Sequence, residues 1–240
     1  MSEQLTLSLL ILVSSIPIVL VFRENGANLK KYVGLLTLYH IMYVGILFLP
    51  IAFTNLSILD GTMNWTGKVL TIIFSLVFYF IVRNNYGDND FIMSLPSKDS
   101  YKKVLIVGLT TIVVMCALTM LFSKGKPLNI EKLAYQLTMP GIDEELWRGI
   151  LLGFIVIIVK KGKFKFGHPA IWITTIIFAL SHSLYFQNWD LGFALDAFII
   201  TGVLGYTLGW MTIYSRSILA ALIFHNLINF STNIIEMLWL

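Results

Sequence analysis

Three short polar clusters interrupt long apolar stretches of this 240-residue chain. They are Asp143-Glu144-Glu145-Leu146-Trp147-Arg148, Phe178-Ala179-Leu180-Ser181-His182 and His225-Asn226-Leu227-Ile228-Asn229. Charged and hydrogen-bonding groups are costly to bury in hydrocarbon, so their presence in membrane-spanning stretches indicates a functional site. Together the clusters provide carboxylates, two imidazoles and an amide, which is the inventory of a hydrolase that works inside a membrane.

The spacing within two clusters places polar side chains on one helix face. Glu144 and Arg148 are four residues apart, so we expect them to pair along a helix that begins with the first cluster. His225 and Asn229 have the same spacing, and His225 lies about 13 Å along a helix from Arg216, deep in the membrane. The structural alternatives are a solvated ion pair, an interfacial histidine and an interhelical hydrogen bond.

The composition indicates an integral membrane protein, because 57% of the residues are hydrophobic, 12% are charged and the mean hydropathy is +0.81. We expect an all-α, polytopic fold of about eight transmembrane helices, with the catalytic core in the last four. The apolar runs place them near residues 5–22, 32–53, 69–82, 103–122, 144–159, 169–182, 191–214 and 218–238. Residues 128–139 are predicted to form a separate interfacial or re-entrant segment. The predicted domains are 1–127, the N-terminal helices, and 128–240, the core.

Lysine and arginine residues of the loops give the expected orientation. Twelve of them fall in the first, third, fifth and seventh loops, and four, Lys68 among them, in the loops of the other side. This excess predicts that both chain termini lie outside. The run from Lys160 to Lys165 is expected to face anionic lipid as a cytoplasmic patch.

In order and spacing, the clusters resemble the motifs of the CPBP family of intramembrane proteases, which includes Abi, CAAX-protease and bacteriocin-processing proteins. The family pattern is Glu-Glu-x-x-x-Arg, Phe-x-x-x-His and His-x-x-x-Asn on successive late helices. The matching residues are Asp143, Glu144 and Arg148 in the first motif, Phe178 and His182 in the second, and His225 and Asn229 in the third. The resemblance covers residues 130–229.

The resemblance implies an intramembrane endopeptidase in which Asp143 and His182 activate a water molecule for attack on a peptide carbonyl. It implies that His225 and Asn229 donate hydrogen bonds to the developing oxyanion. The remaining motif residues, Glu144, Arg148 and Phe178, would complete and support this catalytic set.

Asp143 departs from the family, which has glutamate at this position. Aspartate is one methylene shorter, so its carboxylate is withdrawn from the place that a glutamate reaches. Shifting the pair to Glu144 and Glu145 restores two glutamates, but it puts Gly149 where the family has arginine. We therefore prefer the alignment that begins at Asp143.

No cofactor is expected, because a water site made of carboxylate and histidine needs no metal, and the chain has no His-Glu-x-x-His helix. Zinc held by His182, His225 and Glu144 is the alternative. The expected partners are the lipid bilayer and a membrane-associated peptide or protein, either prenylated, leader-bearing or of bacteriocin type, with no nucleic acid. The expected location is a bacterial cell membrane, as a multi-pass protein.

Two other functions stay open at this point. The departure at Asp143 fits a catalytically impaired family member that acts as a bacteriocin self-immunity factor or as a membrane scaffold for a partner. A small transporter is less favoured, because no broken-helix pair or internal repeat is visible. The sequence leaves the identity of the substrate and the oligomeric state undecided.

Overall fold

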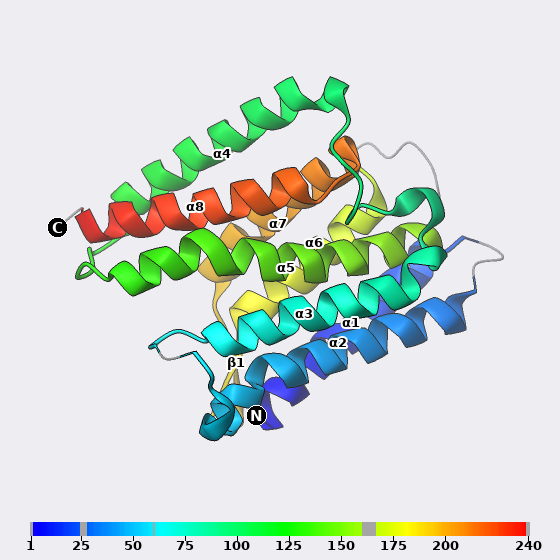
Figure 1. Ribbon diagram of the computed structural model, residues 1–240, viewed down its shortest axis with the longest axis horizontal. Helices are drawn as coiled ribbons and strands as arrows, with labels where there is room; N and C mark the ends of the chain where they lie inside the picture. The colour runs from blue at the N-terminus through cyan, green and yellow to red at the C-terminus, as the bar shows by residue number, and fades with distance from the viewer. Residues whose placement is uncertain (1, 25–27, 60, 160–166, 239–240) are drawn as a thin grey trace.

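The computed structural model describes residues 2–24, 28–59, 61–159 and 167–238 (Figure 1). Its α-helices are α1 (Ser2–Phe22), α2 (Leu29–Ala52), α3 (Trp65–Val82), α4 (Tyr101–Phe122), α5 (Ile130–Ile158), α6 (Pro169–Ser183), α7 (Leu195–Ser215) and α8 (Leu219–Leu238). An antiparallel hairpin of β1 (Leu184–Gln187) and β2 (Asp190–Phe193) joins α6 to α7. The predicted all-α fold is confirmed. The lysine run at 160–165 lies outside the described residues.

Four helical segments of the described chain are long and apolar enough to cross a membrane. They are Leu29–Ala52, Trp65–Asn85, Lys98–Phe122 and Leu195–Ser215, whereas α6 is apolar but shorter. Most side chains that α4 exposes, Val113 and Leu121 among them, are apolar, as expected for a surface that faces lipid. These features support a membrane protein. The total of eight spans and the domain boundary at residue 127 stay predictions.

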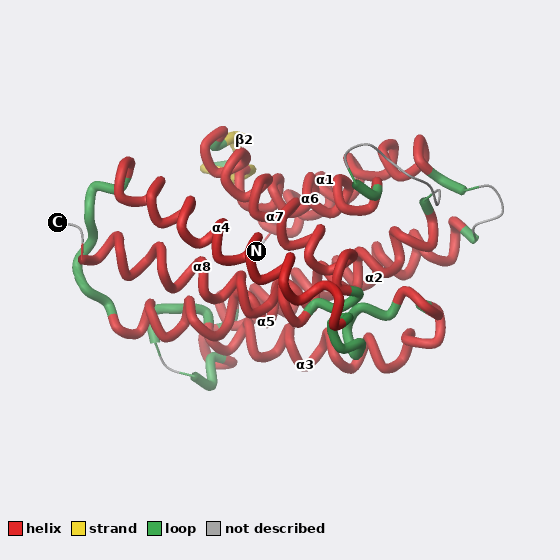
Figure 2. The backbone as a smooth tube through the Cα atoms, turned by 90° about the horizontal axis from the view of Figure 1, so that it is seen from above, coloured by secondary structure: helices red, strands yellow, loops and turns green. Residues whose placement is uncertain are grey.

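The central helix of the bundle is α5. Figure 1 shows it between α8 and α3, with α4 beyond α8 and α2 beyond α3. Seen from above, α1, α6 and α7 lie behind this row as a second layer (Figure 2). The main hydrophobic core surrounds Ile150, Leu151 and Phe154 of α5, which are almost completely buried. Because α6 and α8 both pack on α5, the fold brings the three polar clusters together.

One continuous helix, α5, includes residues 128–139 from Ile130 onward, so the prediction of a separate segment there is wrong. Pro140 lies inside this helix, where proline removes a backbone donor and normally breaks the helix. Asn226 of α8 stabilises this point, because its Oδ1 accepts from the backbone N–H of Gly141 at 2.7 Å. Gly141 permits the close approach, since a Cβ there would lie 2.5 Å from that oxygen. The first cluster is therefore in mid-helix and not at a helix start.

The hairpin between α6 and α7 was not predicted, and α7 begins at Leu195 instead of near residue 191. The two residues of its turn, Asn188 and Trp189, have φ values of 53° and 68°. Positive φ at both central residues is typical of a two-residue hairpin turn, but such turns usually contain glycine, which is missing here. The backbone N–H of Trp189 donates to Glu3 at 2.9 Å and so fixes the hairpin to α1.

Candidate active site

Three consecutive carboxylates, Asp143, Glu144 and Glu145, lie in the middle of α5 and point to three different neighbours. An α-helix turns by about 100° per residue, so consecutive side chains cannot share one face. Asp143 faces α2 and α3, Glu144 faces the histidines of α6 and α8, and Glu145 lies between Arg148 and α8. These directions decide which carboxylate can act on a substrate.

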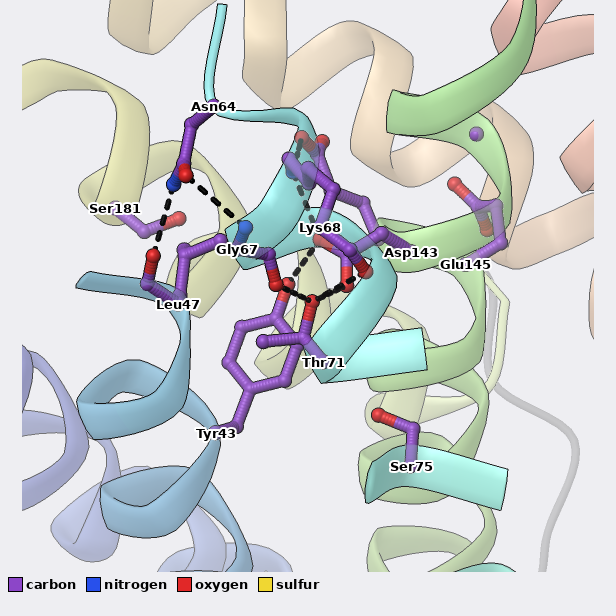
Figure 3. A network of polar contacts seen from close by, with 12 residues as sticks. Tyr43, Leu47, Asn64, Gly67, Lys68, Thr71, Ser75, Asp143, Glu145 and Ser181 are labelled. Carbon is purple, nitrogen blue, oxygen red and sulfur yellow. Dashed lines mark hydrogen bonds and ion pairs between the residues drawn. The ribbon is translucent and has the colours of Figure 1, made fainter. Parts of the chain in front are cut away.

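Asp143 is fully buried and surrounded by hydrogen-bond donors (Figure 3). Its Oδ2 accepts from Tyr43 Oη at 2.5 Å and from Lys68 Nζ at 2.7 Å, and its Oδ1 accepts from Thr71 Oγ1 at 2.5 Å. In the part of the chain that the structure describes, these side-chain partners include no imidazole. The structure therefore does not bring Asp143 and His182 together in the way that the sequence suggested.

Glu144 is the carboxylate that lies beside both histidines. Its Oε2 is 3.6 Å from Nε2 of His182 and 3.7 Å from Nε2 of His225, while its Oε1 accepts from Lys68 Nζ at 2.9 Å. The two distances to the imidazoles are beyond those of direct hydrogen bonds. The arrangement gathers two imidazole nitrogens and a carboxylate oxygen around one small volume.

Glu145 is almost completely buried and links Arg148 to His225. It forms an ion pair with the Arg148 guanidinium, and its Oε1 is 2.8 Å from Nδ1 of His225. The predicted pairing of Arg148 with Glu144 is therefore wrong, because Glu144 turns toward the histidines while Glu145 lies one helical turn from Arg148. Arg148 also donates to the backbone carbonyl of Gly205 in α7 at 3.0 Å. An ionised Glu145 accepts the Nδ1 proton of His225 and so orients the ring.

Phe178 packs against the remaining members of the site. Its ring centroid is 4.3 Å from that of His182 and 6.1 Å from that of His225, and the Arg148 guanidinium lies 5.5 Å above the ring. The Phe178 carbonyl lies 2.8 Å from Nδ1 of His182. A carbonyl can only accept, so this nitrogen carries the proton and Nε2 of neutral His182 is an acceptor facing Glu144.

Two cavities meet at the Glu144 carboxylate. The polar one, toward α8, has a volume of about 290 Å³ and is lined by His225, Asn229 and Asn233 among others. The other, toward α1 and α2, has a volume of about 200 Å³ and a mainly apolar wall. The residues common to both are Lys68, Glu144, Phe178 and His182. Among the described residues, the Asn229 side chain has no hydrogen-bond partner, so its amide is available to a bound molecule.

Sequence reasoning missed four residues of this arrangement, namely Tyr43, Lys68, Thr71 and Glu145. Lys68 was assigned to a loop because it directly precedes the apolar run at residue 69. Its side chain is instead buried in the first turn of α3. Asn64 was the available signal, since its side chain accepts from the backbone N–H of Gly67 and thereby caps a helix that begins before Lys68.

The alternative cofactor was zinc, with His182, His225 and Glu144 as its ligands. Within the described residues, no group of three His, Cys, Asp or Glu side chains is arranged to hold a metal ion. The ammonium of Lys68 already binds the Glu144 carboxylate, and it would repel a divalent cation held by the same group. This donor set does not fit zinc, whereas the absence of any cofactor stays a prediction.

The fold and the site together define an all-α membrane protein with a buried centre of carboxylates and histidines. Residues 126–231 match the family model Rce1-like, described as type II CAAX prenyl endopeptidase Rce1-like. The match contains all three clusters and confirms the resemblance to the CPBP family. Because this is a family of proteases, it supports a peptidase at the level of the class. No curated protein and no solved structure matches the chain significantly.

Proposed function

We propose that the chain is an intramembrane endopeptidase in which Glu144 is the base that activates water. The observation that carries this proposal is the position of Glu144 Oε2, which faces Nε2 of both His182 and His225 at 3.6 and 3.7 Å. Asp143 does not face the histidines. Its carboxylate oxygens already accept hydrogen bonds from Tyr43, Thr71 and Lys68. The base assigned from the resemblance thus moves by one residue.

The proposed reaction begins with a water molecule in the polar cavity, beside both Glu144 and His182. Glu144 takes one proton as the water oxygen attacks the peptide carbonyl carbon, and the carbonyl oxygen becomes the oxyanion. Nε2 of His225 and the amide of Asn229 donate to this oxyanion. The C–N bond then breaks, and the proton held by Glu144 passes to the leaving nitrogen, so that a carboxylic acid and an amine are released.

His225 can donate from Nε2 only when both of its nitrogens carry protons, because Nδ1 already donates to Glu145. The proposal therefore takes His225 as doubly protonated, with Nδ1 toward Glu145 and Nε2 toward Glu144. The buried charges then balance: the cations are Lys68, Arg148 and His225, and the anions are Asp143, Glu144 and Glu145. Such balance is the arrangement in which charged groups are tolerated in a dry interior.

The substrate is proposed to be a membrane-associated peptide, of prenylated, leader-bearing or bacteriocin type, in a bacterial cell membrane. The two cavities that share Glu144 offer a peptide one apolar and one polar wall on either side of the carbonyl to be cut. The self-immunity or scaffold alternative was motivated by Asp143. With Glu144 as base, that motivation is removed.

The decisive experiment compares Glu144→Gln with Asp143→Asn in proteoliposomes. Peptides of the three substrate types are anchored in the same membrane, and new termini are detected by mass spectrometry. Loss of the general base should lower kcat by about 10²- to 10⁴-fold in Glu144→Gln. Asp143→Asn keeps an acceptor for Tyr43 with its amide oxygen, and its NH₂ group can donate to Thr71 Oγ1, whose own proton can go to the Gly67 carbonyl at 3.0 Å, so its kcat should fall by less than about tenfold.

The opposite ranking, with an inactive Asp143→Asn and an active Glu144→Gln, would return the role of base to Asp143. Failure of the folded wild-type chain to cleave any of the three substrate types would refute the endopeptidase proposal itself. His225→Ala serves as a further test, because it should lose activity under either assignment of the base.

A further inference from the structure

Lys68 brings a buried ammonium group to the active site from α3, a helix outside the segment that matches the family. Its Nζ lies 2.7 Å from Asp143 Oδ2 and 2.9 Å from Glu144 Oε1. We propose that Lys68 is a positioning residue that keeps Glu144 ionised and aimed at the two imidazoles. This inference rests on the proposed function, and it adds a residue of the N-terminal half to the catalytic machinery.

The burial of Lys68 argues that this contact is specific. Only 8% of the residue is exposed. Lysine is almost never buried unless its charge has a partner, so this burial depends on the two carboxylates. Its compact ammonium has three N–H groups, and two of them are satisfied by the two carboxylates. An ammonium and two carboxylates stabilise one another in a dry interior, where each alone would be costly to bury.

The first turn of α3, which carries Lys68, is fixed to both neighbouring helices. Asn64 caps the turn and donates from its amide to the Leu47 carbonyl of α2 at 2.8 Å. Glu131 of α5 accepts from the backbone N–H and the hydroxyl of Thr62, both at 2.9 Å. These anchors hold the ammonium at a defined place relative to Glu144.

Asp143 and Glu144 would compete for ionisation if Lys68 lost its charge. Two carboxylates close together in a dry site do not both stay charged, so one takes up a proton. Asp143 retains Tyr43 and Thr71 as donors, whereas Glu144 loses the one direct side-chain hydrogen bond that the described residues give it. The proton therefore goes to Glu144, and a protonated Glu144 cannot accept a proton from water.

The other charged groups around Glu144 interact with it less closely than Lys68 does at 2.9 Å. The histidines, His182 from α6 and His225 from α8, lie beyond hydrogen-bond distance. Arg148, on the same helix, is bound to Glu145. On α7, the residues that line the polar cavity are Thr201 and Leu204, which carry no charge.

The test compares Lys68→Met with the double variant Lys68→Met/Asp143→Asn in the proteoliposome assay. In Lys68→Met, kcat should fall on the order of a hundredfold or more while KM changes less than about threefold, because substrate binding is preserved. In the double variant kcat should recover at least about tenfold, because Glu144 no longer competes with a second carboxylate for ionisation once position 143 is neutral. A lysine with only a structural role would give no such recovery.

The matched control is Lys126→Met. Lys126 also forms a 2.9 Å ion pair, with Glu236, but its side chain is 54% exposed and its partner lies about 16 Å along α8 from His225. Its removal should leave kcat unchanged. If Lys68→Met folds poorly, the kcat of the double variant is compared with that of Asp143→Asn. These two variants differ only at residue 68, so the comparison isolates the effect of Lys68.

Two results overturn the role of Lys68 while leaving the proposed function intact. The first is a folded Lys68→Met variant with wild-type kcat alongside an inactive Glu144→Gln. The second is a folded double variant that gains nothing over Lys68→Met. By contrast, a wild-type chain without peptidase activity refutes the proposed function before Lys68 is tested.

Discussion

Glu145→Gln should impair the site although this residue is not proposed to touch the substrate. Glutamine retains the shape of Glu145 but removes the charge that Arg148 neutralises. Its oxygen will face Arg148, which has only donors, and its NH₂ group will then face Nδ1 of His225. Two donors cannot form a hydrogen bond with each other, so His225 loses its Nδ1 proton and with it the imidazolium form.

The expected magnitudes follow from the burial of the pair, in which both side chains are 1% exposed. Breaking a buried ion pair costs about 3–5 kcal/mol. A retained hydrogen bond to the arginine is worth about 1.5–3 kcal/mol, which leaves a net loss of about 2 kcal/mol. This corresponds to a decrease in Tm of about 4–8 °C. Activity should fall, but by less than the roughly 10²- to 10³-fold that removal of an oxyanion donor costs, because neutral His225 still donates from Nε2 but has lost its positive charge.

The assay combines thermal unfolding in detergent with peptide cleavage in proteoliposomes. Glu145→Leu/Arg148→Met is the matched variant, because replacing a buried ion pair by apolar residues of similar size is often neutral for stability. It should unfold near the wild-type Tm and still have reduced activity, since His225 has no orienting partner. Recovery of activity in this variant, or wild-type activity in Glu145→Gln, would refute the reasoning.

Two further predictions concern the elements that hold the site. Gly141→Ala should destabilise the chain by about 1–3 kcal/mol, because the new Cβ would lie 2.5 Å from Asn226 Oδ1 and 2.6 Å from the Leu222 carbonyl oxygen. The control is Gly45→Ala, since a Cβ at Gly45 would meet nothing within 4 Å. Equal Tm values for the two variants would contradict the packing argument. Hydrogen bonds from the Thr62 hydroxyl and then from the Trp65 indole N–H lower the pKa of Glu131 below its ordinary value of 4.5. The ionised carboxylate therefore stabilises the fold above pH 4.5, and this stabilisation is lost as the pH falls through the lowered pKa. Glu131→Gln should therefore have a lower Tm than the wild type at pH 7 and a similar Tm in acid, and a difference that persists unchanged in acid would show that ionisation of Glu131 is irrelevant.

The apolar runs predicted the helices well, because lipid-facing and core-facing positions are both apolar and leave long uninterrupted patterns. Helix starts were less accurate, since a cap is a single polar residue that can precede the apolar run by several positions, as Asn64 precedes the run that begins at residue 69. The continuity of α5 through Pro140 could not be predicted, because it depends on Asn226, which is distant in sequence and close only after folding. The prediction therefore failed where long-range contacts replace a local rule.

The same limit explains why the sequence did not show which of the three carboxylates faces the two histidines. A motif gives the order of Asp143, Glu144 and Glu145, whereas the rotation of α5 decides which one faces the histidines. A helix turns by about 100° per residue, so an alignment error of one position redirects a carboxylate to another neighbour. The shorter side chain of Asp143 is then no defect, because it faces Lys68 and Thr71 instead of the cavity. Under the proposed function, Asp143 acts indirectly, because it shares Lys68 with Glu144 and so helps to position the proposed base.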